Sequence, residues 1–186
     1  VFSAAEMADN LIDQDPATWW QPSADDVLRD WWIEVDLGRM VYATKIRLTF
    51  PDTTGAEPFR NFSVYVNDGE RSVAAKDIFQ FIRVGRTTEP NRERVVEYTL
   101  STLDPGPATG EHLVTADTLD YAAVQYIRFV PEHVQPGAAL AEVEVIAIGD
   151  NIALGTVLRG GSVRAGTSIG NSGAFSDGDH NTSWTM

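Results

Sequence analysis

The fold class is decided by a short stretch that reads WWIEVDL from Trp31 to Leu37. Apolar residues at Trp31, Ile33, Val35 and Leu37 alternate with two acidic residues in its second half. Because successive side chains of a β-strand point to opposite faces, this period of two predicts a strand with one apolar and one acidic face. An amphipathic helix would instead repeat its apolar positions every three or four residues.

Short runs of the same kind follow along the chain, with Gly, Pro, Asn or Asp in the gaps between them. They lie at residues 42–50, 62–66, 78–84, 94–100, 124–130 and 140–148. In the first of these runs Tyr42, Ile46, Leu48 and Phe50 are expected to share one face of a strand. A helical pattern is confined to short pieces such as residues 4–12. Short, regularly spaced strands predict an all-β sandwich or barrel.

The charge balance narrows the classes of partner. The chain of 186 residues carries 14 Lys and Arg against 27 Asp and Glu, a formal net charge of -13. Nucleic acids and anionic lipids are bound chiefly through Lys and Arg, and no apolar run is long enough to span a bilayer. Cysteine is absent, which excludes disulfides, thiolate nucleophiles and Cys-based metal sites. We therefore expect no nucleic-acid partner and no membrane insertion, whereas abundant carboxylates favour divalent cations such as Ca²⁺.

The pattern Asp-x-Asp-x-x-Thr-x-Trp occurs twice, at residues 13–20 and again at residues 177–184. Such a recurrence predicts a tandem array of similar units. We expect residues 1–149 to form one unit that lacks its first strand segment, and residues 150–186 to open a second, incomplete unit. Residues 151–165 are expected either to pack on the first unit as its first strand or to begin the second unit.

The first copy of the repeated pattern carries oxygen ligands. In a tight loop the carboxylates of Asp13 and Asp15 and the hydroxyl of Thr18 could converge on one Ca²⁺, which takes about six to eight oxygen ligands. The loop is not an EF-hand, because Thr18 stands where that motif requires Gly. The same spacing is typical of Asx-turns, in which Asp side chains accept hydrogen bonds from the backbone of their own loop. Spacing alone leaves both interpretations open.

Four segments stand together in the order and spacing of a known family. They read NLIDQDPATWW at residues 10–20, WIEVDLG at 32–38, VQYIRFV at 124–130 and ALAEVEV at 139–145. Together they resemble the discoidin, or coagulation-factor type C, domain of the galactose-binding-domain-like superfamily, which also contains bacterial carbohydrate-binding modules. The resemblance covers residues 8–149, with a poorly matching part at 84–118. It implies an all-β fold, an eight-stranded antiparallel jelly-roll β-sandwich.

The resemblance also implies a structural Ca²⁺ beside the first long loop. Carried over by position, its ligands are the carbonyls of Asn10 and Ala141 and the side chains of Asp13, Asp15, Thr18 and Glu142. The residues around Glu142 agree with this role, because an inward-facing carboxylate among apolar neighbours needs a counter-charge or a metal. We expect the ion to stabilise the fold and order the loop rather than to take part in a reaction.

A carbohydrate site needs an aromatic face for the sugar ring and fixed polar groups for its hydroxyls. Candidates in or beside the expected loops are Trp19, Arg29, Asp30, Trp31 and His133. The alternative role for a tryptophan is core packing, which is expected for Trp20 and Trp32 and is open for Trp31. Trp19 is then the tryptophan expected to be exposed, since Trp20 occupies the position that the family buries.

Two patterns resemble catalytic motifs but lack the required context. The sequence GTSIG at residues 166–170 matches a nucleophile elbow, yet too little chain follows it for the strand and long helix that such an elbow joins. Glu142 and Glu144 are two residues apart on one expected strand, so they would point the same way and could not flank a sugar from both sides. We therefore expect no enzymatic activity.

The sequence thus predicts a non-catalytic, calcium-stabilised binding module of a multidomain extracellular protein, with carbohydrate or a glycoconjugate as its ligand. The alternative is a structural or adhesive repeat that contacts neighbouring domains of the same protein and has no glycan site. Eukaryotic discoidin domains usually carry a disulfide between their ends. The absence of cysteine therefore favours an extracellular or cell-surface protein of a prokaryote.

Overall fold

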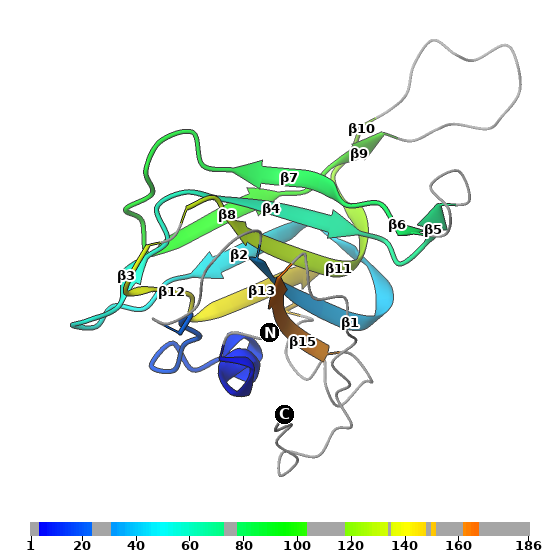
Figure 1. Cartoon of the computed structure of the whole chain (residues 1–186). Coiled ribbons are helices and arrows are strands. Elements are labelled where there is room, and N and C mark those ends of the chain that lie inside the picture. The colour runs from blue at the N-terminus through cyan, green and yellow to red at the C-terminus, as the bar shows by residue number, and fades with distance from the viewer. Residues whose placement is uncertain are drawn as a thin grey trace, which may run out of the picture.

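A computed structural model describes residues 4–23, 31–72, 78–103, 118–133, 135–147, 150–151 and 162–167. Its elements are η1 (Ala5–Ile12), β1 (Trp31–Ala43), β2 (Lys45–Thr49), β3 (Glu57–Pro58), β4 (Phe62–Asn67), β5 (Arg71–Ser72), β6 (Ile78–Phe79), β7 (Ile82–Arg86), β8 (Val95–Thr99), β9 (Thr102–Leu103), β10 (Thr118–Leu119), β11 (Ala122–Pro131), β12 (Ala138–Ala139), β13 (Glu142–Ala147), β14 (Asp150–Asn151) and β15 (Ser162–Thr167). Apart from the 3-10 helix η1, these elements are strands (Figure 1). No helix among the described residues is long and apolar enough to cross a membrane.

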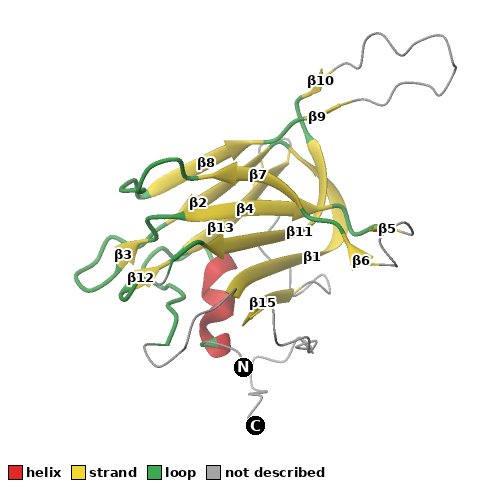
Figure 2. Ribbon diagram, turned by 45° about the horizontal axis from the view of Figure 1, so that its top comes forward, coloured by secondary structure: helices red, strands yellow, loops and turns green. Residues whose placement is uncertain are grey.

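Two antiparallel sheets form the layers of a sandwich (Figure 2). The larger sheet has the strand order β15-β1-β11-β4-β7, and the smaller has the order β14-β13-β2-β8. The short pairs β3–β12, β5–β6 and β9–β10 lie at the two ends of the sandwich. The predicted all-β antiparallel sandwich is confirmed. Its expected count of eight strands is not, because the described residues place nine strands in the two large sheets.

The chain passes from the larger to the smaller sheet at Thr44, between β1 and β2. β1 pairs with β11, whereas β2 pairs with β13, and the Thr44 amide donates a hydrogen bond to the Ile146 carbonyl at 2.8 Å. Tyr42 consequently does not share the buried face of Ile46, and its side chain is 59% exposed. The expectation of one continuous strand over residues 42–50 is wrong, because an alternating pattern does not reveal a change of sheet.

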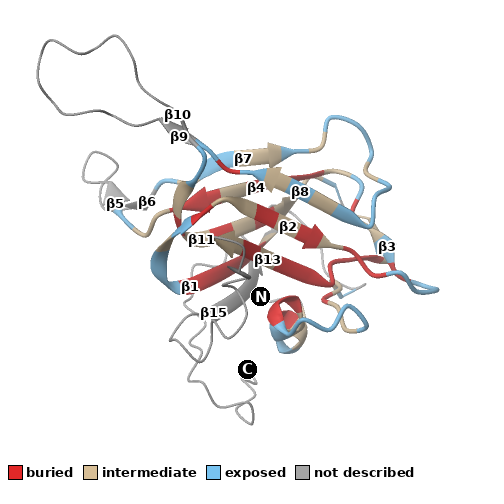
Figure 3. Ribbon diagram, turned by 180° about the vertical axis from the view of Figure 1, so that it is seen from behind, coloured by how far each residue is buried: buried red, intermediate tan, exposed pale blue. Residues whose placement is uncertain are grey.

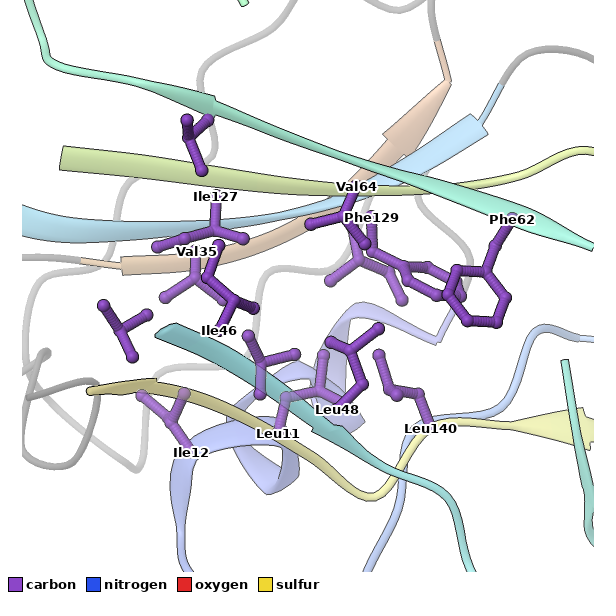
Figure 4. Packing of buried hydrophobic residues seen from close by; sticks show 14 of the residues in the cluster. Leu11, Ile12, Val35, Ile46, Leu48, Phe62, Val64, Ile127, Phe129 and Leu140 are labelled. Carbon is purple, nitrogen blue, oxygen red and sulfur yellow. The ribbon is translucent and has the colours of Figure 1, made fainter. Parts of the chain in front are cut away.

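The core lies between the sheets and is richest in aromatic side chains at one end (Figure 4). The Phe129 ring centroid is 4.9 Å from that of Phe62 and 5.2 Å from that of Phe59. Phe59 in turn stacks on Trp20, a side chain with no exposed surface. Among the described residues the buried ones lie mainly in the central strands of the two sheets and in η1 (Figure 3). Each fully buried apolar side chain of this kind stabilises the fold by about 1.5–3 kcal/mol.

The acidic face of β1 is also covered. Glu34 and Asp36 are only 5% and 8% exposed. The Arg128 guanidinium donates to Glu34 Oε2 at 2.6 Å and lies 4.4 Å above the centre of the Trp32 ring. Trp32 therefore packs, half-buried, on the outer side of the larger sheet and not in the core where it was expected, because it alternates with the buried Ile33.

Gly85 fixes how closely the edge strands β7 and β8 approach each other. A Cβ atom at Gly85 would lie 2.3 Å from Cε1 of Tyr98, far inside van der Waals contact. We expect Gly85→Ala to lower the free energy of unfolding by about 1–3 kcal/mol in urea titrations. The double variant with Tyr98→Ala is the control, and the alanine at position 85 should cost little in that background. An equal cost in both backgrounds would rule out the contact as the cause.

Candidate functional site

The first long loop leaves η1 at Asp13 and turns sharply. Asp13 Oδ1 accepts a hydrogen bond from the Asp15 amide at 2.8 Å, and Asp15 Oδ1 accepts one from the Ala17 amide at 3.0 Å. Gln14 between them has a φ of 63°, in the left-handed region. These contacts are two successive Asx-turns, one of the two interpretations that the spacing left open. They fold the loop so that Asp13 is held at a defined place beside the sandwich.

Further contacts attach the loop to the body of the protein. The Thr18 hydroxyl lies 2.7 Å from Asp13 Oδ2, and Asn10 Nδ2 donates to the Trp19 carbonyl at 3.1 Å. Trp20 forms an isolated antiparallel bridge with Leu140, in which each amide donates to the other residue's carbonyl at 2.8 and 3.0 Å. The loop is therefore fastened directly to the segment that leads into β13.

Glu142 begins β13 and has an unusual environment. Its side chain is 5% exposed, and neither of its two buried carboxylate oxygens forms a hydrogen bond of good geometry, although the Gln14 backbone lies close enough to oppose the rise in its pKa. Burial, and after it the neighbouring Asp13 carboxylate, raises the pKa of Glu142 to about 8. A buried carboxylate without donors costs about 1–3 kcal/mol or more, and a second carboxylate beside it adds repulsion. Among the described residues, the carboxylates of Asp13 and Glu142 therefore lack a neighbouring positive charge.

A divalent cation fits this pair, because it would neutralise both carboxylates and satisfy the orphaned oxygens of Glu142. Asp13, Thr18 and Glu142 could supply side-chain ligands. The contacts of the Asp15 carboxylate lie within its own loop. Ala141 is buried next to Glu142, and its amide donates to the Thr49 carbonyl at 2.8 Å. Within the described ranges no three His, Cys, Asp or Glu side chains converge, so hydroxyl and carbonyl oxygens would have to complete the shell.

Of the five candidate sugar-binding residues, the chain segments of Trp19 and His133 lead to the end of the sandwich that carries β3 and β12: Trp20 bridges to Leu140 beside β12, and the Glu132 amide donates to the Asn61 carbonyl beside β3. That end is on the left in Figure 1. Trp19 is half-buried and His133, just beyond β11, is exposed. Trp31 starts β1 at the same end, because Ile33 pairs with Phe129 near the end of β11. Arg29, Asp30 and the Trp31 side chain lie outside the described residues.

A polar cluster at this end was missed by the sequence analysis. Gln135 Oε1 accepts a hydrogen bond from the Arg60 amide at 2.9 Å, and Gln135 Nε2 donates to Glu57 Oε2 at 3.3 Å. Arg60 Nη2 forms an ion pair with the same Glu57 oxygen at 3.2 Å. The Glu132 amide, beside His133, donates to the Asn61 carbonyl. No sequence signal could have revealed this cluster, because its members come from two loops far apart in the chain.

Comparison with known proteins identifies the fold. No protein-family model matches the sequence, and no curated protein matches it. The family 32 carbohydrate-binding module of NanJ from Clostridium perfringens, in complex with galactose, superposes with a TM-score of 0.53 at 15% identity, over 78% of this chain and 88% of that one. CpGH89CBM32-5 from Clostridium perfringens, in complex with GalNAc-β-1,3-galactose, gives 0.51 at 13% identity, over 78% and 92%.

A structure of the CBM32-1 and CBM32-2 domains of Clostridium perfringens ZmpB likewise gives a TM-score of 0.51 at 16% identity, over 77% of this chain and 32% of that one. At these identities the similarity establishes the fold. The chain therefore has the galactose-binding-domain-like, or discoidin-like, fold, and the resemblance predicted from the four sequence segments is confirmed at that level.

Proposed function

We propose that the chain is a non-catalytic carbohydrate-binding module, stabilised by Ca²⁺, of a multidomain extracellular protein of a prokaryote. The shared fold supports this proposal, since two of the similar structures contain galactose and GalNAc-β-1,3-galactose. We place the glycan at the loop end formed by Trp19, His133 and the cluster of Glu57, Arg60 and Gln135.

The observation that carries the glycan proposal is the composition of that loop end. Trp19 is half-buried, whereas its neighbour Trp20 is fully buried and anchors the loop in the core. Arg60, Glu57 and Gln135 hold one another through the hydrogen bonds described above, so their polar groups are fixed in place. An aromatic side chain at the same end of the sandwich as hydrogen-bonding groups is the combination that a sugar requires.

The calcium proposal depends on Glu142. Asp13, Thr18 and Glu142 would hold the ion, with Asp15 and the carbonyls of Asn10 and Ala141 as the further predicted ligands. When bound, the ion supplies the positive charge that the two facing carboxylates lack. Because Asp13 is in the loop and Glu142 is in β13, the ion would hold both segments together and keep the loop that carries Trp19 in place.

Glycan binding by the full chain tests the proposed function. We expect an array of galactose- and GalNAc-terminated glycans to give binding that Trp19→Ala weakens about 10- to 30-fold in calorimetric titrations, the loss typical of a central aromatic contact. The matched control is Tyr42→Ala, since Tyr42 is an exposed aromatic residue at the opposite end of β1. An absence of binding to every glycan would favour the structural or adhesive repeat, and equal losses in both variants would exclude the proposed location.

A further inference from the structure

β15 completes the edge of the larger sheet. It pairs antiparallel with β1 over six positions, from Trp31 opposite Thr167 to Asp36 opposite Ser162. It stands last in the strand order β15-β1-β11-β4-β7, so β1 is its only neighbour in that sheet. Figures 1 and 2 show it beside β1, at the margin of the sandwich.

By its place in the sequence, β15 falls within residues 150–186, the predicted opening of a second unit. It follows the predicted joint at residues 149–150 and precedes the second Asp-x-Asp-x-x-Thr-x-Trp pattern at 177–184. The sheet that it completes is nevertheless made of strands from the first repeat. A strand of one predicted unit thus closes the sheet of the other.

The edge of β1 requires such a partner. β1 is 13 residues long, and without β15 the backbone groups along one side of residues 31–36 would be open. Long open edges of this kind pair readily with strands of other chains.

We propose that the place beside β1 is a strand-exchange site that accepts the 162–167 strand of a second copy of this chain as well as its own. The strand from a second copy would form the same six backbone pairings. Exchange then changes only which chain supplies the strand, as in domain swapping. Consecutive units of an array, or two separate chains, would become linked in this way.

Disulfide trapping tests the exchange directly, because the described residues contain no cysteine and the whole sequence has none. Full chains carrying Val35→Cys are mixed with full chains carrying Val163→Cys under oxidising conditions, below the unfolding temperature. We expect a covalent mixed dimer. The matched control replaces Val163→Cys by Arg164→Cys, which is one residue out of register, and should give at least tenfold less dimer, since a one-residue slip moves the side chain to the other face.

A second pair of cysteine substitutions is needed because the geometry at one pair of positions can prevent a disulfide from forming. Opposed positions alternate between hydrogen-bonded and non-hydrogen-bonded pairs, so Trp32→Cys with Gly166→Cys covers the other type. Dimer from at least one in-register pair, with little from the off-register mixture of Val35→Cys and Arg164→Cys, supports the exchange. No dimer from either pair, or equal dimer from in-register and off-register pairs, overturns it.

Sedimentation of concentrated chains provides a test without cysteine. We expect a concentration-dependent dimer, because exchange would join two chains through the same six pairings that close one chain. No dimer at any concentration would also overturn the proposal.

Discussion

Replacing Trp20 by alanine is expected to lower the free energy of unfolding by about 3–5 kcal/mol, the usual cost of truncating a fully buried tryptophan. Trp20 has no exposed surface, and its ring centroid lies 6.5 Å from that of Phe59 in a stacked arrangement. The substitution would leave a cavity at the aromatic end of the core. Urea titrations of the full chain measure the effect through the transition midpoint and slope.

The neighbouring variant Trp19→Ala is the matched control for this prediction. The hydrogen bond at that residue runs from Asn10 to its backbone carbonyl, which alanine keeps, and its side chain is only half-buried. We therefore expect Trp19→Ala to cost well under half as much as Trp20→Ala. Similar losses in the free energy of unfolding for the two variants would contradict the assignment of Trp20 to the core and of Trp19 to the surface.

Removing Ca²⁺ is expected to lower the melting temperature by roughly 5–10 °C. An ion present at about one hundred times its dissociation constant stabilises the native state by about 2.7 kcal/mol, and each kcal/mol shifts the midpoint of a chain of this size by about 2–4 °C. Thermal denaturation with excess Ca²⁺ and with a chelator measures the difference. Identical melting temperatures in the two conditions would refute the calcium proposal.

The variant Glu142→Gln separates calcium binding from other effects. It removes a carboxylate ligand while keeping the shape of the side chain, so it should abolish the response of the melting temperature to Ca²⁺. Glu144→Gln is the matched control. It lies two residues further along the same strand and pairs with Arg47 at 3.3 Å, so it should keep the full response. A full response in Glu142→Gln would show that the ion binds elsewhere.

The alternation of apolar and polar residues was sufficient to predict most of the strands. The alternation at 31–37 and at 62–66 predicted β1 and β4, because one residue in two had to face a core. The run at 78–84 instead divides into β6 and β7, and the 42–50 run divides at Thr44 between two sheets. Such breaks depend on where the chain meets its partner strands, which a pattern of polarity does not contain.

The residues of the candidate site also divide into those that the sequence could predict and those that it could not. Asp13, Thr18 and Glu142 could be named from sequence because the family resemblance placed them, and the structure brings Asp13 and Glu142 together. The cluster of Glu57, Arg60 and Gln135 could not be named, since hydrogen bonds between two distant loops create it. The metal ligands and the individual sugar contacts stay predictions until the experiments above are done.

The sequence by itself determined that the chain is an all-β antiparallel sandwich of the discoidin-like fold. The alternation of apolar and polar residues and the order of the four short segments can both be read directly from the sequence. Only the tertiary structure decided that Glu142 is buried beside Asp13 and that β15 closes the edge of β1. Each of these facts depends on contacts between residues far apart in the chain, and a free energy of desolvation or strand pairing exists only once those residues meet.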